Sequence, residues 1–212
     1  MNNIAFASLG EAWINLVNLT TQTGTRLGDE GYEVLGVGVE FPAMGESDPV
    51  IEQFGDRQMI ADIKNVFFMQ GPNSLGHSYA GLMHGPAGRH DLQDVIALLG
   101  GKPLSKRAVV TLCGNADGKV PCVNVIQFLV RDGALQTMYY ARGQDAFRKF
   151  YADGLCLATM SRTVANGLGL AAGRVTGFIG SSHIYEYDLP AIRRMLAEGR
   201  NYLRPCGEGG PR

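Results

Sequence analysis

Two apolar segments joined by a short turn constrain the fold of this chain more than any other feature. Residues 123–130 and 135–140 each have the length and the β-branched or aromatic content of a strand. Asp132-Gly133 between them is a dipeptide typical of a tight hairpin turn. A hairpin joins antiparallel strands, so the chain is not a regular alternation of parallel strands and helices.

Further strands and helices are expected on both sides of this hairpin. Strand-like runs occur at 32–41, where glycines indicate a bulge or the close approach of another backbone, at 107–112 and at 174–179. Apolar residues at helical spacing predict helices at 90–99 and 155–168. The order of these elements predicts an α+β fold in which a mixed or largely antiparallel sheet packs against helices.

The composition indicates one domain that binds a small ligand. The 212 residues, 45% of them hydrophobic, are enough for a core that requires no metal or disulfide. No linker or repeat divides the chain, so we expect residues 1–212 to form a single domain with frayed residues at 206–212. The 19 Lys and Arg residues balance 20 Asp and Glu residues, which disfavours polymeric nucleic acid and membrane surfaces as partners.

The N-terminus and the cysteines favour a cytoplasmic protein. Residues 1–20 have no basic segment and contain Glu11, unlike a secretory signal, and no apolar run approaches the roughly 20 residues of a membrane span. The cysteines form no CxxC pair and have no close histidine partner, so we expect reduced thiols and no metal site. These cysteines are Cys113, Cys122, Cys156 and Cys206.

The start of the strand at 123–130 is the first place where the sequence offers reactive chemistry. Cys122 follows Pro121 there, although a single cysteine beside an apolar strand is more often a small core residue. A nucleophilic role requires a cation that lowers the pKa of the thiol. Arg142, after the strand at 135–140, is able to clamp a phosphate and stabilise a thiolate, although an isolated arginine is more often simply solvated.

These segments together resemble the thymidylate synthase family. The run PCVNVIQFLVRDGALQTMYYARGQDAF is similar, without a gap, to the family's Pro-Cys-His motif with its Gln-Phe strand, turn and Arg-x-x-Asp. GSSHIYEYDL resembles the family's Gly-Asp-x-His-x-Tyr, LGHSYAG its Leu-Gly-x-x-Tyr-Gly, and PLSKRAVV its Ser-Arg-Arg segment. The resemblance runs from about residue 75 to 196. It implies a thymidylate synthase-like fold and a homodimer formed through the sheet.

The resemblance assigns roles to the matched residues. Cys122 is expected to attack C6 of a pyrimidine nucleoside monophosphate, so that C5 accepts a one-carbon unit from 5,10-methylenetetrahydrofolate, and Tyr79 to assist proton transfer at C5. Arg142 is expected to bind the phosphate together with Lys106 and Arg107 of a second subunit. The other matched residues, expected to bind the nucleotide, are Gln127, Asp145, His183 and Tyr185. Singly, each would more often be an ordinary core or surface residue, so the assignment depends on their order.

Asp153 is the departure from the family pattern that bears most on the substrate. It stands where thymidylate synthases have an asparagine that reads O4 and N3 of uracil. A carboxyl group with one shared proton matches the amino donor and the N3 acceptor of cytosine. The family's cytidylate hydroxymethylases have the same replacement, so the resemblance favours 5-hydroxymethylation of CMP or dCMP. An aspartate before Gly154 in a turn or helix cap is the alternative.

Other departures leave parts of the resembled site unassigned. Val123 replaces a histidine, Gly143 a phosphate-binding serine, Lys149 a glycine near the folate, and Gln22 an arginine for which Arg26 is able to substitute. Residues 56–68 lack the family's helix pattern, so its catalytic glutamate is not placed; the candidates are Glu11, Glu52 and Asp62.

The C-terminal segment that closes over folate in the family is expected to be absent. An open site tolerates hydroxymethylation, in which water is a reactant, better than methyl transfer. A uridylate methylase or hydroxymethylase, and a non-catalytic nucleotide-binding homologue, remain the alternatives.

Overall fold

The computed structural model describes residues 4–43, 47–71, 73, 78–83, 91–112 and 120–204. Its strands are β1 (Ile4–Ala5), β2 (Thr25–Leu27), β3 (Gly31–Pro42), β4 (Val109–Thr111), β5 (Val123–Arg131), β6 (Ala134–Ala141), β7 (Gln144–Asp145) and β8 (Ala171–Tyr185). Its helices are α1 (Leu9–Thr23), α2 (Pro49–Phe54), α3 (Arg57–Phe68), α4 (Tyr79–Met83), α5 (Leu92–Gly101), α6 (Phe150–Leu168) and α7 (Leu189–Glu198), with 3-10 turns at Glu186–Asp188 and Arg200–Tyr202.

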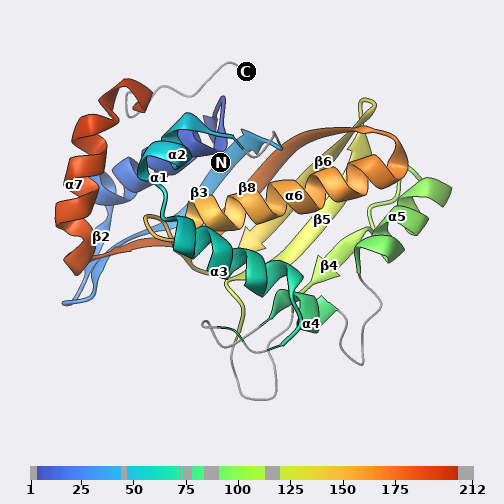
Figure 1. Cartoon of the computed structure of the whole chain (residues 1–212), viewed down its shortest axis with the longest axis horizontal. Coiled ribbons are helices and arrows are strands. Elements are labelled where there is room, and N and C mark those ends of the chain that lie inside the picture. The colour runs from blue at the N-terminus through green and yellow to red at the C-terminus, as the bar shows by residue number, and fades with distance from the viewer. Residues whose placement is uncertain are drawn as a thin grey trace.

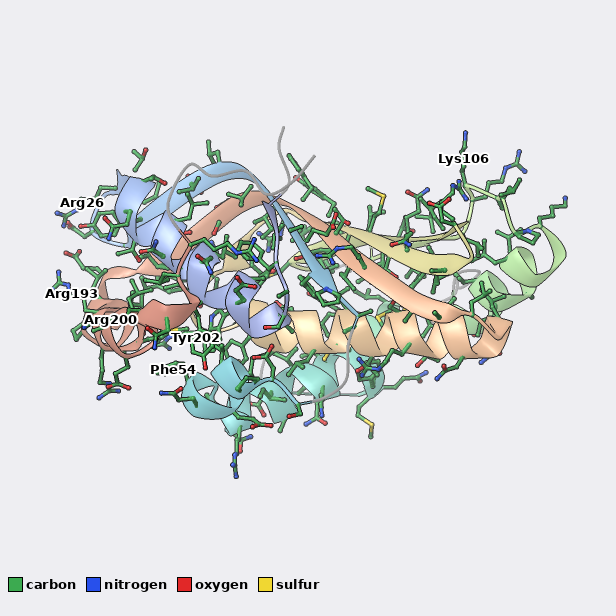
Figure 2. The ribbon with its side chains drawn as sticks, turned by 90° about the horizontal axis from the view of Figure 1, so that it is seen from above. Arg26, Phe54, Lys106, Arg193, Arg200 and Tyr202 are labelled. Atoms are coloured by element: carbon green, nitrogen blue, oxygen red, sulfur yellow. The ribbon has the colours of Figure 1, made fainter. Side chains whose placement is uncertain are left out.

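These elements form one mixed sheet packed against helices, which confirms the α+β class and the mixed sheet. The strand order is β1-β3-β8-β6-β5-β4, with β2 paired to β3 and β7 paired to β8. Figure 1 shows α6 crossing the sheet and α3 lying alongside α6. The edge view of Figure 2 places α2 and α3 on the far side of α6 from the strands. In the described part of the chain, no helix is both long and apolar enough to cross a membrane.

The hairpin between β5 and β6 forms as the sequence predicts. Arg131 pairs with Ala134 across a turn in which Asp132 and Gly133 have φ values of +51° and +73°. Both angles are positive, as a tight turn matched to the twist of the strands requires. The hairpin therefore fixes the start of β5, and the residue before it, relative to the end of β6.

The parallel pairing of β6 with β8 requires a crossover, and α6 supplies it. The strand β8 extends well beyond the predicted range 174–179, because it pairs with β3 on one side and with β6 and β7 on the other. Its additional residues include Ser181 and Ser182, which have little intrinsic preference for strands. Tertiary pairing therefore decides the length of this strand.

A glycine in β3 marks the point where the alternation of side chains reverses. After this point the odd-numbered residues face the helices, so Val37 is buried. Before it the even-numbered residues do, so Val34 packs on the core and Leu35 is 71% exposed. Gly36 between them has a φ of +69°, a left-handed conformation that favours glycine. The pairing of β3 with β8 keeps the same register before and after Gly36. The irregularity that the glycines predict therefore occurs without an extra residue in the strand.

Two helices differ from the expectations of the sequence. Residues 57–68 form α3, a helix that was not assigned from the sequence because the segment lacks the family's helix pattern. Asp56 caps this helix by accepting hydrogen bonds from the amides of Gln58 and Met59 at 2.7 and 3.2 Å. Helix α6 begins at Phe150, five residues before the predicted start, and therefore contains Asp153 in its first turn.

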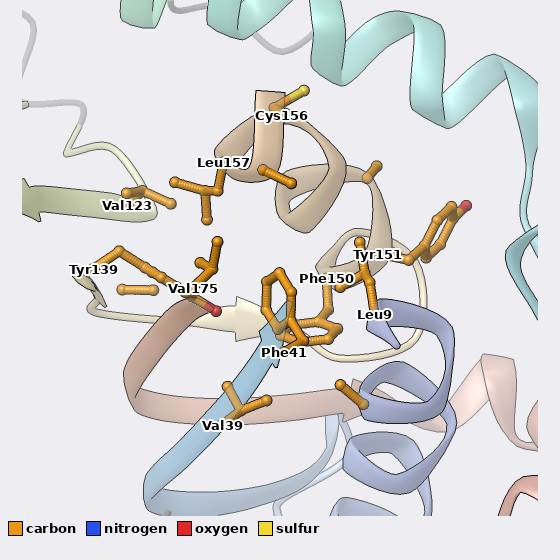
Figure 3. Packing of buried hydrophobic residues seen from close by; sticks show 14 of the residues in the cluster. Leu9, Val39, Phe41, Val123, Tyr139, Phe150, Tyr151, Cys156, Leu157 and Val175 are labelled. Carbon is orange, nitrogen blue, oxygen red and sulfur yellow. The ribbon is translucent and has the colours of Figure 1, made fainter. Parts of the chain in front are cut away.

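Large side chains from α1, α6 and the covered face of the sheet form the core. Figure 3 shows Phe41 of β3 beside Phe150 of α6, and their rings meet edge to face at a centroid separation of 6.1 Å. Trp13 of α1 packs against Tyr151 of α6 at 4.1 Å. Each of these four residues is at most 2% exposed, so each contributes roughly 1.5–3 kcal/mol through burial. This packing holds the first turn of α6 firmly against the sheet.

The opposite face of the sheet carries exposed apolar side chains. They are Leu35, Met138, Tyr140 and Phe178, and each is at least 37% exposed. The rings of Tyr140 and Phe178 stack with centroids 5.8 Å apart. A set of neighbouring exposed hydrophobic residues of this kind is typical of an interaction surface.

Candidate active site

The residues that precede β5 are held in place by the end of β6. The backbone amide of Arg142 donates to the carbonyl oxygen of Cys122 at 2.9 Å. The guanidinium of Arg142 donates to the carbonyl oxygens of Val120 and Pro121 at 2.8 and 3.0 Å. Arg142 itself is exposed, so its remaining N–H groups face solvent. The arginine thus braces the segment that carries Cys122 and stays accessible to an anion.

The Cys122 thiol is half-buried, and this burial is the main cause that raises its pKa above the ordinary value. The Asp153 carboxylate raises the pKa further, whereas the charges of Arg142 and Lys149 lower it. The cations that a nucleophilic cysteine requires are therefore present. They do not outweigh burial and Asp153, so the thiol stays protonated until its surroundings change.

Tyr79 begins α4 and lies beside Cys122. Its hydroxyl oxygen accepts a hydrogen bond from the Val123 amide at 3.3 Å, and its ring meets Phe67 at a centroid separation of 4.7 Å. Burial, together with the charges of Asp153 and Cys122, raises the pKa of the Tyr79 phenol. The phenol is thus neutral at any physiological pH and is able to donate a proton or a hydrogen bond.

Asp153 lies in the first turn of α6 and is only 5% exposed. Its Oδ2 accepts a hydrogen bond from Nε2 of Gln144 at 2.7 Å, and the residue preceding α6 is Lys149. The alternative role of Asp153 in a turn or helix cap is therefore wrong. Burial raises the pKa of Asp153 to about 6, against the lowering effects of the Gln144 hydrogen bond and the charge of Lys149. Both the carboxyl and the carboxylate forms are accessible near neutral pH.

Asp145, His183 and Tyr185 meet where β7 pairs with β8. Asp145 is opposite His183 in this pairing, and its Oδ1 accepts a hydrogen bond from the Arg148 amide at 2.8 Å. Burial raises the pKa of the Asp145 carboxyl, and the adjacent His183 opposes this shift. The rings of His183 and Tyr185 lie edge to face at 5.5 Å. The structure thus brings together three of the residues matched to nucleotide binding.

Gln127, Lys106 and Arg107 lie elsewhere. The Nε2 group of Gln127 donates to the Lys106 carbonyl oxygen at 2.9 Å, which ties β5 to the segment before β4. Gln127 is five positions along from Cys122, which at the rise of an extended strand corresponds to about 17 Å. Lys106 and Arg107 are both exposed, and Figure 2 shows Lys106 at one end of the molecule, far from Arg26. Within one chain they do not join the other predicted site residues.

The comparison with known proteins agrees with this arrangement. Residues 57–205 match the family model for thymidylate synthase, which covers well over half of the chain. The chain belongs to the thymidylate synthase family. A putative thymidylate synthase of Methanocaldococcus jannaschii is 33% identical to it over 87 residues, 41% of this chain and 39% of that protein. A thymidylate synthase of Listeria monocytogenes serotype 4a is 26% identical over 110 residues, 50% of this chain and 35% of that protein.

These alignments cover well under half of either relative. The activity, substrate and partners of this member of the thymidylate synthase family are therefore matters for proposal.

Residues 75–77 of the LGHSYAG segment lie outside the described residues, as do Cys113 and Cys206. Cys122 and Cys156 are free thiols. Among the described residues, no group of three or more His, Cys, Asp or Glu side chains is arranged to hold a metal ion.

The residues considered as substitutes for missing family residues are engaged elsewhere. Arg26 forms an ion pair with Glu186 at 3.2 Å. Of the candidates for the family's glutamate, Glu11 pairs with Arg204 at 2.6 Å, Glu52 accepts from Ser47 at 2.8 Å, and Asp62 accepts from Gln58 at 2.9 Å. The carboxylates whose charges reach Cys122 are instead Asp153 and Asp145. Each of the three candidates thus already has a hydrogen-bonded or ion-paired partner.

Sequence reasoning missed Gln144 as a residue of the site and noted Lys149 only as a departure from the family. Lys149 lies next to the first turn of α6, and its charge lowers the pKa of Cys122, Asp153 and Asp145. Gln144 binds Asp153 directly. Their position in the sequence could have indicated both residues, because they lie between Arg142 and Asp153, which were assigned to the site.

Proposed function

We propose that this protein transfers a one-carbon unit to C5 of a pyrimidine nucleotide, and that the substrate is CMP or dCMP and the product its 5-hydroxymethyl derivative. The observation that carries the proposal is the grouping of Cys122, Tyr79 and Asp153 near the start of α6: the Tyr79 hydroxyl bonds the amide next to Cys122, and the Asp153 carboxylate raises the pKa of both other groups. A nucleophile, a neutral proton donor and a group for reading the base are the parts that this chemistry needs.

Asp153 in its protonated form matches the edge of cytosine. One oxygen donates its proton to N3, which is an acceptor in cytosine, and the other accepts an N–H of the 4-amino group. The pKa of about 6 makes this form available at a small cost near neutral pH. A uracil ring presents an N–H at N3 and an acceptor at O4, so it is opposed by the carboxylate form at O4 and pairs with the carboxyl form only if the proton lies on the oxygen that faces O4.

Protonation of Asp153 also favours activation of the nucleophile. The Asp153 carboxylate raises the pKa of Cys122, so its neutralisation by a bound cytosine removes that effect and leaves the charges of Arg142 and Lys149 acting on the thiol. The Cys122 sulfur then bonds to C6, and the electron pair of the C5–C6 double bond moves to C5. After C5 has bonded the one-carbon unit, loss of the C5 proton, addition of water to the new carbon and release of the sulfur from C6 give the 5-hydroxymethyl product and free Cys122. Tyr79 is placed to assist proton transfer at C5.

A cavity beside the start of α6 fits an aromatic carbon donor such as methylenetetrahydrofolate. It has a volume of about 330 Å³ and is lined by apolar and charged side chains: Trp13, Phe54, Asp56, Met59, Phe147, Arg148, Tyr151 and Asp188. Aromatic side chains suit the ring of such a donor, and Arg148 in its wall is paired with Asp188 at 2.7 Å. The donor supplies carbon at the oxidation level of formaldehyde.

We also propose that two copies of the chain associate through the open face of the sheet. The exposed side chains of Leu35, Met138, Tyr140 and Phe178 provide an apolar surface there. Lys106 and Arg107 precede β4 next to Gln127, which is itself about 17 Å along β5 from Cys122, so they reach a phosphate only in the site of a second copy. Such an arrangement would complete the phosphate site from both subunits.

Product analysis tests the proposed reaction. The purified protein is incubated with methylenetetrahydrofolate and with CMP, dCMP, UMP or dUMP, and the nucleotides are analysed by mass spectrometry. The proposal predicts addition of CH2O to CMP or dCMP. Methylation of a uridine nucleotide instead would establish the alternative reaction, and binding without any product would favour a non-catalytic homologue.

A further inference from the structure

Gln144 combines one strong hydrogen bond with one unpaired buried atom. It lies in β7, opposite Ser182 of β8, and is 1% exposed. Its Nε2 donates to Oδ2 of Asp153 at 2.7 Å. Within the described part of the chain, its Oε1 is fully buried and has no hydrogen-bond partner. Buried acceptors are nearly always paired in native proteins, so this atom indicates an absent donor.

The orientation of the amide follows from its partner. The carboxylate form of Asp153 only accepts hydrogen bonds, so in that form the amide presents its NH2 group to Asp153 and its Oε1 to the other side. The reversed amide would place two acceptors 2.7 Å apart. Gln144 therefore marks Oδ2 as the accepting oxygen of Asp153. With the amide held in this orientation, the proton of the carboxyl form resides on Oδ1.

We propose that Gln144 is a specificity-determining residue that selects cytosine over uracil. This inference depends on the proposed function, because it assigns Gln144 a contact with the base that Asp153 reads. The 4-amino group of cytosine has two N–H bonds. One is donated to Oδ2 of Asp153 and the other to Oε1 of Gln144, while Oδ1 of Asp153 donates its proton to N3.

The same arrangement rejects uracil at two points. The O4 atom of uracil is an acceptor, so it leaves Oε1 of Gln144 unpaired and faces a second acceptor in Oδ2 of Asp153. A site built around buried hydrogen bonds discriminates strongly against a ligand that leaves its polar groups unpaired. A carboxyl group alone accommodates either base, depending on which of its oxygens holds the proton. Gln144 fixes the accepting oxygen, so the pair of residues selects the amino group of cytosine.

Two substitutions separate this role from a purely structural one. Gln144→Met retains the approximate length of the side chain and removes both the donor and the acceptor. Gln144→Glu retains an acceptor, and when protonated it also restores a donor toward Asp153. Gln136→Met is the matched control, because the Gln136 Oε1 accepts from the Arg174 amide at 3.0 Å in another part of the sheet.

The experiment measures binding of CMP and UMP by calorimetry between pH 5.5 and 8, in a Cys122→Ala background that prevents turnover. Gln144→Met is expected to lower the ratio of CMP to UMP affinity at least tenfold. Gln144→Glu is expected to keep the ratio near pH 5.5 and to lose it near pH 8, where two adjacent carboxylates repel. Gln136→Met is expected to leave the ratio unchanged.

A ratio that both Gln144 variants leave unchanged at every pH overturns the inference. If Gln144→Met does not fold, the pH dependence of Gln144→Glu decides, and a ratio independent of pH overturns it as well. Equal weakening of CMP and UMP would show that Gln144 only supports Asp153, which also contradicts the inference. If Gln144 is intact and the protein still does not prefer cytidine nucleotides, the proposed function itself fails, and this result is distinct from the others.

Discussion

The hydroxyl of Tyr79 accepts a hydrogen bond from the backbone amide of Val123, the residue that follows the predicted nucleophile. This contact joins α4 to the start of β5 and places a neutral phenol beside the Cys122 thiol. Tyr79→Phe removes the proton donor and leaves the Val123 amide unpaired. We expect exchange of the C5 hydrogen of the nucleotide with water (C5 exchange), measured by tritium release, to slow by roughly 10²-fold. Nucleotide affinity, measured by calorimetry, should change little. The unfolding free energy should fall by about 1–3 kcal/mol. Unchanged exchange would remove Tyr79 from the mechanism.

Cys122→Ala should abolish C5 exchange while leaving CMP affinity within about tenfold, because the thiol contributes a covalent bond and little binding surface. Cys156→Ala is the matched control, since Cys156 is also a free thiol near Asp153 but is only 1% exposed. We expect this control to retain exchange. Equal exchange by Cys122→Ala and the wild-type protein would refute the assignment of the nucleophile.

Asp153→Asn should shift the substrate preference from cytidine toward uridine nucleotides. With the Gln144 side chain turned so that its Oε1 accepts from the new NH2 group, the new amide donates to O4 and accepts from the N3–H of uracil, and it no longer offers a hydrogen to N3 of cytosine. One mismatched buried hydrogen bond costs about 1–3 kcal/mol, so the ratio of kcat/KM values should change at least tenfold. Asp62→Asn on α3 serves as a control, because Asp62 is only partly buried and its side chain bonds that of Gln58. A mutant that keeps the wild-type ratio would show that Asp153 does not read the base.

The raised pKa of Asp153 also predicts a dependence of stability on pH. The pKa rises from 3.8 in the unfolded chain to about 6 in the folded protein, so the folded state binds more protons between these values. Stability therefore decreases as the pH rises from about 4 to 6. Asp153→Asn removes this effect and should stabilise the protein by about 1–3 kcal/mol at pH 7–8 but not below pH 4, as measured by denaturant unfolding. Equal effects at both pH values would contradict the assignment.

The hairpin of β5 and β6 was predictable because its signals are local. Alternating apolar residues and the Asp132-Gly133 turn suffice to define it. The start of α6 was not predictable in the same way. Lys149 gives no side-chain cap, and Gly154 is unfavourable inside a helix. Gly154 is nonetheless suited to this place, because a Cβ there would lie 2.5 Å from Leu9 of α1.

The candidate site was predictable where it depends on residue type and order. Cys122, Tyr79 and Asp153 were expected together and are brought together. The bond from Gln144 to Asp153 depends on how β7 packs against α6, and the sequence carries no local signal for this contact. The distance of Gln127 and Lys106 from Cys122 likewise depends on the pairing of β4 with β5.

Association of two copies through the open face of the sheet is testable by placing charge on it. Tyr140→Glu and Phe178→Glu put carboxylates where two exposed, stacked rings now lie. Each is expected to convert a dimer to monomers in light scattering at micromolar concentration, and to reduce C5 exchange because Lys106 and Arg107 of the second copy are lost. Wild-type monomers with full activity would contradict the proposed dimer.

The most direct test of the account is the release of tritium from C5 of labelled CMP, dCMP and dUMP by the wild-type protein and by Cys122→Ala. Exchange at C5 requires addition of the Cys122 sulfur to C6 and a correctly bound base, and it does not depend on completion of the carbon transfer. We expect release from CMP or dCMP by the wild-type protein, much slower release from dUMP, and none from any nucleotide by Cys122→Ala. Release from dUMP alone, or release that persists in Cys122→Ala, would contradict it.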